Sequence, residues 1–372
     1  MNIEQLVIEA QNRRASDVHI VCGLPVRVRI DGRLVDFDAH ILTHDECEAI
    51  ARELCGSAYA RIEECGELDF ALTFADSIRC RLNVFRQQGH PSVALRILSD
   101  RIPKLGDLGV PPAVTMFPQF QRGIVIVTGE TGSGKSTTLA ALIDALNHTR
   151  EQHIITLEDP IEYIYHSDLC TINQRQIGQD TDSYDTGLRA ILREDPDIIL
   201  IGEMRGIETI EAAITAAETG HLVFATLHTN SASDTIDRII DVFPGDKQPQ
   251  IRLQLAMTLK AVLAQQLLPA ASGTGRVLAC EVMMVNDAIK NLIREGKTPQ
   301  IQNTIATTAE LGNITMDRCL IDLARTRKIT PEVAVDSCHD VETVCMALGV
   351  PIPRASAVNE GGRGGSRKMT MF

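Results

Sequence analysis

A short glycine-rich segment constrains the fold of this chain more than any other feature. Ile124–Thr128 is an apolar, β-branched run, which indicates a buried parallel strand. Gly129–Ser136 follows it and matches the pattern G-x-x-x-x-G-K-[S/T] at every defined position. Beyond it, Leu139 and Leu142 have helical spacing. A strand, a glycine loop and a helix in this order predict a phosphate-binding loop.

The residue types of this loop suit a triphosphate, whose dense negative charge needs many donors at close range. Glycines let backbone N–H groups turn inward, and the following helix offers its positive end. Lys135 is expected to reach the β- and γ-phosphates, and Ser136 to bind a Mg²⁺ ion. A glycine-rich turn that binds nothing is the alternative, but the strand and the helix on either side favour a binding site. The predicted binding residues are Gly129, Glu130, Thr131, Gly132, Ser133, Gly134, Lys135, Ser136 and Thr137.

Composition narrows the class of partner. The 372 residues are long enough for two or three domains and carry 36 Lys and Arg against 49 Asp and Glu, a formal net charge of -13. This balance argues against a nucleic-acid groove as the main surface. Aromatic residues make up 3% of the chain and Trp is absent, so stacking on bases is not expected either. We therefore predict an acidic protein that does not bind nucleic acid.

Membrane, secretion and zinc signals are absent from the sequence. No apolar run approaches the roughly 18 to 20 residues of a spanning helix, and the N-terminus lacks the pattern of a signal peptide. The ten cysteines include no C-x-x-C pair, which argues against a zinc knuckle and favours reduced thiols. These features predict a cytoplasmic protein without a transmembrane segment.

The first hundred residues predict a small α+β domain. Residues 2–14 have the spacing of an amphipathic helix, residues 25–35 alternate as a hairpin around an Asp-Gly turn, and residues 44–64 are again helical. Further alternating strands fall within residues 67–98. Several prolines in residues 101–120 then predict an interdomain linker with a brief helix.

Beyond the linker, the pattern is that of an α/β fold. Buried strands are expected at 124–128, 154–157, 198–201 and 222–226, separated by helices, which predicts a doubly wound parallel sheet over residues 121–272. Helices are expected at 251–266, 288–295, 298–307, 316–326 and 331–337. We therefore expect a helical C-terminal region over 273–350 and a tail without fixed structure over 351–372.

Carboxylates follow two of the predicted strands, at the edge where open α/β sheets bind their ligands. Glu158 and Glu162 come after the strand at 154–157, and Glu203 comes after the strand at 198–201. Glu203 is expected to polarise the attacking water, while Glu158 and Glu162 shape the metal and water shell, with Glu162 as a second ligand of Mg²⁺. For the first pair, a solvated turn is a fair alternative.

Two histidines flank the strand predicted at 222–226. His221 precedes it and His228 follows it, beside a glycine and a Thr-Asn pair. A lone histidine is usually packed or exposed without a task. This arrangement suggests instead that both sense the γ-phosphate or transmit its loss.

Taken together, these motifs resemble a known family. The phosphate loop, GluAspProIleGlu at 158–162, GlyGluMetArg at 202–205 and the histidine motif at 218–229 resemble the Walker A, Asp-box, Walker B and His-box set of the secretion and pilus traffic ATPases. The match is best with the type IV pilus retraction ATPases and extends over nearly all of residues 1–345 through 16–20, 237–244 and 288–295.

The resemblance implies an architecture and an activity. It implies a PAS-like N-terminal domain, a RecA-like P-loop ATPase domain, and a homohexamer that hydrolyses Mg-ATP between neighbouring subunits to retract a pilus and drive twitching motility. Arg81 and Arg96 stand where the family carries arginines that act on a neighbour's nucleotide. The implied partners are an inner-membrane platform protein of the pilus and a paralogous retraction ATPase. The implied location is peripheral, at the inner face of the cell membrane.

Other functions remain open. A pilus assembly or type II secretion ATPase usually has a longer N-terminal extension and a four-cysteine zinc knuckle, which this chain lacks, and an accessory retraction ATPase is a further alternative. A small-molecule kinase or a nucleotide-dependent switch belongs to another class. Lys290 departs from the family signature at 288–295, because an ammonium cannot reproduce the fork of an arginine.

Overall fold

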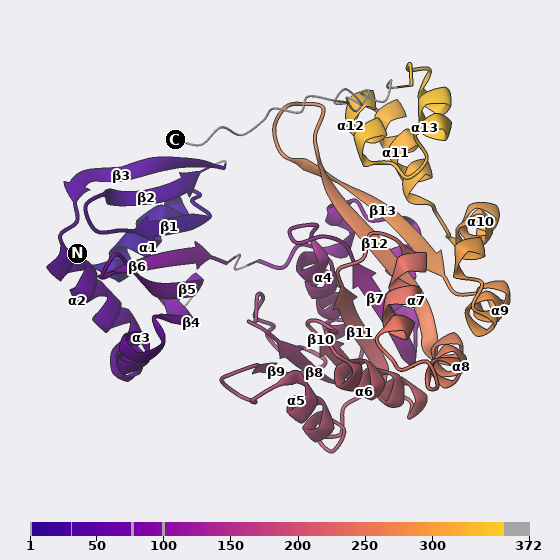
Figure 1. Ribbon diagram of the computed structural model, residues 1–372, viewed down its shortest axis with the longest axis horizontal. Coiled ribbons are helices and arrows are strands. Elements are labelled where there is room, and N and C mark those ends of the chain that lie inside the picture. The colour runs from indigo at the N-terminus through magenta and orange to yellow at the C-terminus, as the bar shows by residue number, and fades with distance from the viewer. Residues whose placement is uncertain (1, 31, 76–77, 99–100, 353–372) are drawn as a thin grey trace, which may run out of the picture. The chain divides into compact units, whose positions relative to one another are not determined.

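The computed structural model describes residues 2–30, 32–75, 78–98 and 101–352. The chain divides into two units: Met1–Leu267 with Leu278–Thr315, and Leu268–Val277 with Met316–Phe372. Figure 1 labels their helices and strands. Of the tail predicted at 351–372, residues 353–372 lie outside the described part of the chain, as does Asp31 of the predicted hairpin turn.

The N-terminal part contains a six-stranded antiparallel sheet with three helices. The strand order is β3 (Arg33–Ile41), β2 (Pro25–Ile30), β1 (Asp17–Ile20), β6 (His90–Ile97), β5 (Ile78–Gln87) and β4 (Glu67–Phe74). Apolar residues of α1 (Ile3–Asn12), α2 (His44–Cys55) and α3 (Tyr59–Cys65) pack with alternate strand residues in one core. Burial of every second strand residue leaves the opposite face polar. The predicted α+β fold of this part is confirmed.

A seven-stranded sheet forms the centre of the same unit. Its order is β13 (Arg276–Met284), β12 (Leu259–Pro269), β7 (Gly123–Thr128), β11 (Leu222–Leu227), β10 (Ile198–Ile201), β8 (His153–Glu158) and β9 (Thr171–Gln176). Every pairing from β12 to β9 is parallel. The four strands expected from the sequence are β7, β8, β10 and β11, so the parallel α/β sheet is confirmed.

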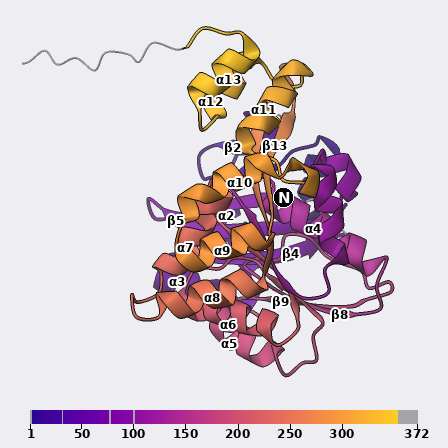
Figure 2. The same ribbon diagram turned by 90° about the vertical axis from the view of Figure 1, so that its right-hand side faces the viewer.

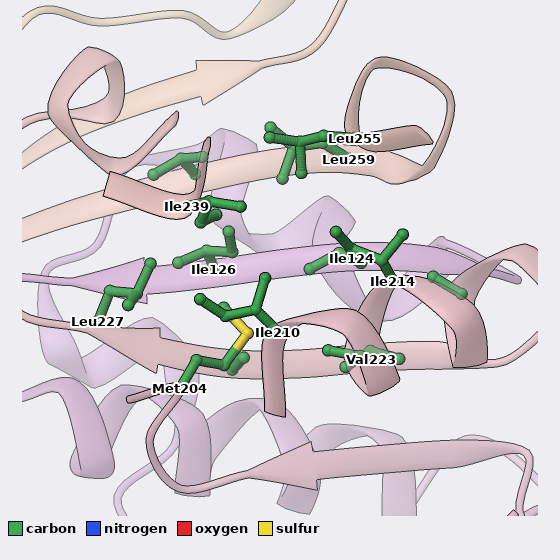
Figure 3. Packing of buried hydrophobic residues seen from close by; sticks show 14 of the residues in the cluster. Ile124, Ile126, Met204, Ile210, Ile214, Val223, Leu227, Ile239, Leu255 and Leu259 are labelled. Carbon is green, nitrogen blue, oxygen red and sulfur yellow. The ribbon is translucent and has the colours of Figure 1, made fainter. Parts of the chain in front are cut away.

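Helices cover both faces of this sheet, which explains why its strands read as unbroken apolar runs. Ile124 and Ile126 of β7 pack in the layer of α6 (Ile207–Glu218), where Figure 3 shows them near Ile210 and Ile214. Val125 and Val127 point the other way, toward α4 (Lys135–Asn147). A strand buried on both faces has no polar side to reveal its alternation.

The remaining helices of this unit pack on the α6 face. They are α5 (Tyr184–Ile191), α7 (Ala232–Asp241), α8 (Gln248–Thr258), α9 (Asp287–Glu295) and α10 (Ile301–Thr307), and each contributes apolar residues to one core. Figure 2 shows α7, α8 and α9 grouped together. Short 3₁₀ turns lie at Gly56–Ala58, Leu105–Leu108, Pro112–Gln119, Thr298–Gln300 and Ala309–Leu311.

Three strands correct the sequence-based expectation. The helix expected over 251–266 ends at Thr258, and the chain continues as β12; β13 then lies within the region expected to be helical, and β9 was not predicted. A short apolar run fits a buried helix as well as a strand, so periodicity alone did not separate them. Residues 259–269 form a strand because they pair with β7.

The second unit contains the helices α11 (Met316–Arg325), α12 (Pro331–Ser337) and α13 (Val341–Leu348). The first two were predicted, and α13 was not. Among the described residues, no helix is long and apolar enough to cross a membrane. No disulfide joins the ten cysteines, all of which lie in the described part of the chain.

Candidate active site

The phosphate loop has a backbone that requires glycine. Gly129, Gly132 and Gly134 have φ values of 141°, 82° and 93°, which side chains with a Cβ rarely adopt. A Cβ on Gly129 would lie 2.3 Å from the carbonyl oxygen of Gln265 and 2.7 Å from Ser133 Oγ. The loop can therefore pass this close to β12 only because residue 129 is glycine.

Two features of the loop fit a bound phosphate. No side chain among the described residues caps the N-terminus of α4, so its first N–H groups are available to a ligand. Ser133 Oγ is buried and has no hydrogen-bond partner in the described part of the chain. A buried polar atom without a partner is costly, and a phosphate oxygen would satisfy it.

Lys135 lies at the centre of this loop. It is 8% exposed, and its Nζ donates to the carbonyl oxygens of Gly129 at 2.7 Å and Glu130 at 3.0 Å. Burial lowers the pKa of Lys135, although the charges of Glu203 and Glu162 oppose this effect. The ammonium is thus held within the loop, where the charges of two of the predicted carboxylates act on it.

Glu203 follows β10 and is joined to Lys135 through His228. His228 Nδ1 lies 3.5 Å from Lys135 Nζ, and His228 Nε2 lies 3.2 Å from Glu203 Oε1. Arg205 Nε contacts the same carboxylate oxygen at 2.6 Å. Burial raises the pKa of Glu203, but the hydrogen bond from Arg205 and the charge of His228 outweigh it, so the pKa lies below its usual value. The structure therefore brings Lys135, His228 and Glu203 together.

The loop that carries His228 is fixed directly to the phosphate loop. Thr229 N donates to Thr128 Oγ1 at 2.8 Å, and Thr128 Oγ1 lies 2.8 Å from the carbonyl oxygen of Thr229. Thr128 is the last residue of β7, immediately before Gly129. A shift of the His228 loop would therefore disturb the entrance of the phosphate loop.

The two carboxylates after β8 lie in different environments. Glu158 is 8% exposed and accepts from Thr156 Oγ1 at 2.6 Å and from Gln174 Nε2 at 3.2 Å. Burial raises the pKa of Glu158, against the hydrogen bonds from Thr156 and Gln174. Glu162 is exposed. Glu158 therefore supports the loop, whereas Glu162 is accessible to a ligand.

Two residues near the site, Gln174 and Tyr163, were not predicted from the sequence. Gln174 of β9 binds Glu158, donates to the carbonyl oxygen of Tyr163 at 2.7 Å and accepts from Tyr165 N at 2.9 Å, so it fixes the acidic loop. The hydroxyl of Tyr163 lies 2.9 Å from Thr137 Oγ1 and connects that loop to α4. The polar sequence of β9 gave no strand signal, so nothing pointed to Gln174.

His221 is not brought to the phosphate loop. It directly precedes Leu222 of β11, which pairs with Gly123 at the start of β7. Its Nδ1 lies 2.8 Å from the carbonyl oxygen of Ala216. His228 follows the same strand, so the length of the strand, about 20 Å, separates the two histidines. The expectation that both sense one γ-phosphate is corrected, because the two ends of a parallel strand lie at opposite edges of the sheet.

Arg81 and Arg96 lie side by side on the polar face of the N-terminal sheet. They are directly paired across β5 and β6, and their side chains are 47% and 65% exposed. Arg96 Nε donates to Asp17 Oδ1 at 2.8 Å, whereas Arg81 lies 4.0 Å from Asp69. The two guanidinium groups thus form an exposed basic pair.

Gly202 separates the end of β10 from Glu203 and lies in a crowded place. A Cβ at residue 202 would lie 2.9 Å from the hydroxyl of Tyr184, 3.0 Å from the carbonyl oxygen of Leu157 and 3.2 Å from Glu158 Cα. Contacts this short leave no room for a side chain. Residue 202 is therefore glycine, and Glu203 is the first residue after β10 that carries a side chain.

This crowding gives a stability prediction. Gly202→Ala should lower the free energy of unfolding by about 1–3 kcal/mol, because the added methyl overpacks the exit of β10. Gly245→Ala is the matched control, since nothing lies within 4 Å of a Cβ there. Thermal unfolding of both variants tests the claim, and an unchanged midpoint for Gly202→Ala would contradict it.

Comparison with known proteins places this site in a family. The model of the type II/IV secretion system protein family matches residues 1–315. The type IV pilus retraction ATPase PilT of Pseudomonas aeruginosa is 42% identical over 335 residues, which are 90% of this chain and 97% of PilT. A twitching motility protein of Neisseria gonorrhoeae is 46% identical over 268 residues, 72% of each chain.

A solved structure supports the same assignment. The crystal structure of the pilus retraction motor PilT with bound ADP matches with a TM-score of 0.87 and 43% identity, over 92% of this chain and 98% of that one. The predicted architecture, a RecA-like domain with an N-terminal α+β domain, is thereby confirmed. Because the family model covers most of its length, the chain belongs to the type II/IV secretion system protein family.

Proposed function

We propose that this protein is a motor ATPase that hydrolyses Mg-ATP to retract type IV pili. The observation that carries the proposal is the continuous contact from Lys135 in the phosphate loop, through His228, to Glu203. The high identity to a named retraction ATPase, over nearly the full length of both chains, supports the choice of system.

In this proposal, the phosphate loop binds the nucleotide. The N–H groups at the start of α4 and the ammonium of Lys135 neutralise the β- and γ-phosphates. The Ser136 hydroxyl and the exposed Glu162 would hold Mg²⁺, which withdraws charge from the phosphates when it is bound. Glu158 is buried among its donors, so we assign it to support of this loop.

We assign Glu203 to orient the water molecule that attacks the γ-phosphate. A pKa below its usual value keeps the carboxylate ionised, so it accepts a hydrogen bond from water and orients it toward the γ-phosphate. His228 lies between this carboxylate and Lys135 and therefore responds when the phosphate leaves. His221 has no part in this chemistry within the same subunit.

The proposal places the nucleotide at the interface between subunits of a homohexamer. Residues 1–100 would supply Arg81 and Arg96 to the phosphate loop of a neighbour, where exposed guanidinium groups can stabilise the charge of the transition state. Closing and opening of this interface would convert hydrolysis into movement. The ring would bind a platform protein at the inner face of the cell membrane.

Mixing two inactive variants tests the shared site. Arg81→Ala keeps its phosphate loop, and Lys135→Ala keeps its arginines, so a mixed interface combines two intact halves. At equal concentrations about one quarter of the interfaces are intact, and ATPase activity should recover toward that fraction. Arg81→Ala mixed with Arg96→Ala is the control, because every interface then lacks an arginine. Absence of recovery at any ratio would refute arginines acting between subunits.

The cellular role is tested by deletion of the gene. Surface pili should accumulate while twitching motility stops, because assembly continues without retraction. Loss of the pili would instead indicate an assembly ATPase, and intact pili with a secretion defect would indicate a type II secretion ATPase. Partial loss of motility would fit an accessory retraction ATPase. ATP turnover by the purified protein without any acceptor separates all of these from a small-molecule kinase.

A further inference from the structure

A buried carboxylate lies outside the site described above and has no role in it. Glu281 of β13 has no exposed surface, and residue alternation places it on the same face as Met283, within the apolar layer of α6 to α10. Burial of a carboxylate in such a layer is costly unless donors compensate it. Its hydrogen bonds therefore indicate what it holds in place.

The first hydrogen bond of Glu281 leads to the His228 loop. Its Oε1 accepts from Ala232 N at 2.8 Å, and Ala232 is the first residue of α7. The helix does not need this contact as a cap, because Ser231 Oγ already accepts from Asp234 N at 3.1 Å. Glu281 thus adds an anchor between β13 and the start of α7, three residues after Thr229.

The second hydrogen bond of Glu281 leads to helix α10. Glu281 Oε2 accepts from Gln302 Nε2 of α10 at 2.9 Å. The other amide atom, Gln302 Oε1, is buried and has no hydrogen-bond partner among the described residues. The carboxylate of Glu281 therefore joins α10 to the first residue of α7, and α7 begins directly after the loop that carries His228.

We propose that Glu281 is a positioning residue for ATP hydrolysis, which holds the start of α7 so that the His228 loop stays against the phosphate loop. The loop is fixed at one end by Thr128 and at the other by Glu281. Release of the second end lets His228 move away from Lys135 and Glu203. This inference rests on the proposed role of His228.

The test compares turnover with nucleotide binding. Glu281→Ala should lower kcat about tenfold or more, since a displacement of about 1 Å at a reacting centre costs this much, while the Kd for ATP changes less than about twofold. Glu281→Gln should stay within about threefold of the wild-type kcat, because a flip of the Gln302 amide lets its free Oε1 accept from the new amide. A purely structural role would not separate kcat from Kd in this way.

A double variant shows whether Glu281 acts through His228. Combined with His228→Ala, Glu281→Ala should add no further loss of kcat, since the loop has nothing left to position. Multiplied losses, or wild-type kcat in Glu281→Ala, would overturn the inference. Wild-type kcat in His228→Ala would overturn both it and the proposed role of His228. If Glu281→Ala does not fold, Gln302→Ala replaces it, with an expected loss of about threefold that is likewise absent in the double variant.

Discussion

Lys135→Ala is expected to weaken ATP binding about a hundredfold and to abolish turnover. The ammonium contributes charge-assisted hydrogen bonds to phosphate, each worth about 1.5–3 kcal/mol, so affinity should fall by about a hundredfold. The fold should survive, because the lysine contacts carbonyl oxygens of its own loop and belongs to none of the three apolar clusters. Binding of a fluorescent ATP analogue measures the loss.

A second lysine provides the control for this experiment. Lys297→Ala removes the same charge from an exposed ion pair with Glu295. Exposed pairs contribute little to stability, so its binding and turnover should match those of the wild type. Equal ATP affinity in Lys135→Ala and Lys297→Ala would refute the phosphate-binding role of the loop.

Glu203→Gln is expected to trap the protein with ATP bound. The amide has the shape of the carboxylate but lacks its charge, so it orients and polarises the attacking water poorly. Turnover should fall by about a thousandfold, within the range that general-base and positioning effects supply together. Affinity for ATP should be retained, because the phosphate loop is unchanged.

Single-turnover measurements separate the two steps. ATP should bind to Glu203→Gln at the wild-type level and remain unhydrolysed. Glu211→Gln, which changes an exposed residue of α6, should behave as the wild type. Normal turnover in Glu203→Gln would remove the central assignment of the proposal, and loss of binding would assign the residue to the nucleotide pocket instead.

The parts of the fold that could be predicted are those whose signal is local. The strands β7 and β10 are short, β-branched and bounded by turn residues, so their positions follow from composition alone. β12 has a similar apolar run, but it follows α8 without a break, and the sequence offers no boundary between them. Only its place beside β7 makes it a strand.

Some residues of the candidate site could likewise be predicted from local sequence, and others could not. Lys135, Glu203 and Glu162 follow strands or form the glycine loop, so their convergence at one edge of a parallel sheet could be predicted. His221 could have been excluded from the sequence, because it precedes its strand, and in a parallel sheet the residue before a strand lies at the edge opposite the phosphate loop. Gln174 could not be found, since its strand is polar and irregular in pattern.

The sequence by itself determined the phosphate loop, the strands next to it and the acids that follow those strands, because each depends on neighbours within a few residues. It also determined the family, because the family's motifs recur along nearly the whole chain. Tertiary structure alone decided that His228 contacts both Lys135 and Glu203, that Glu158 is buried, and that Glu281 joins β13 to α7 and α10. Those relations depend on side chains that are distant in the chain, and only packing of the sheet and helices brings them into hydrogen-bond range.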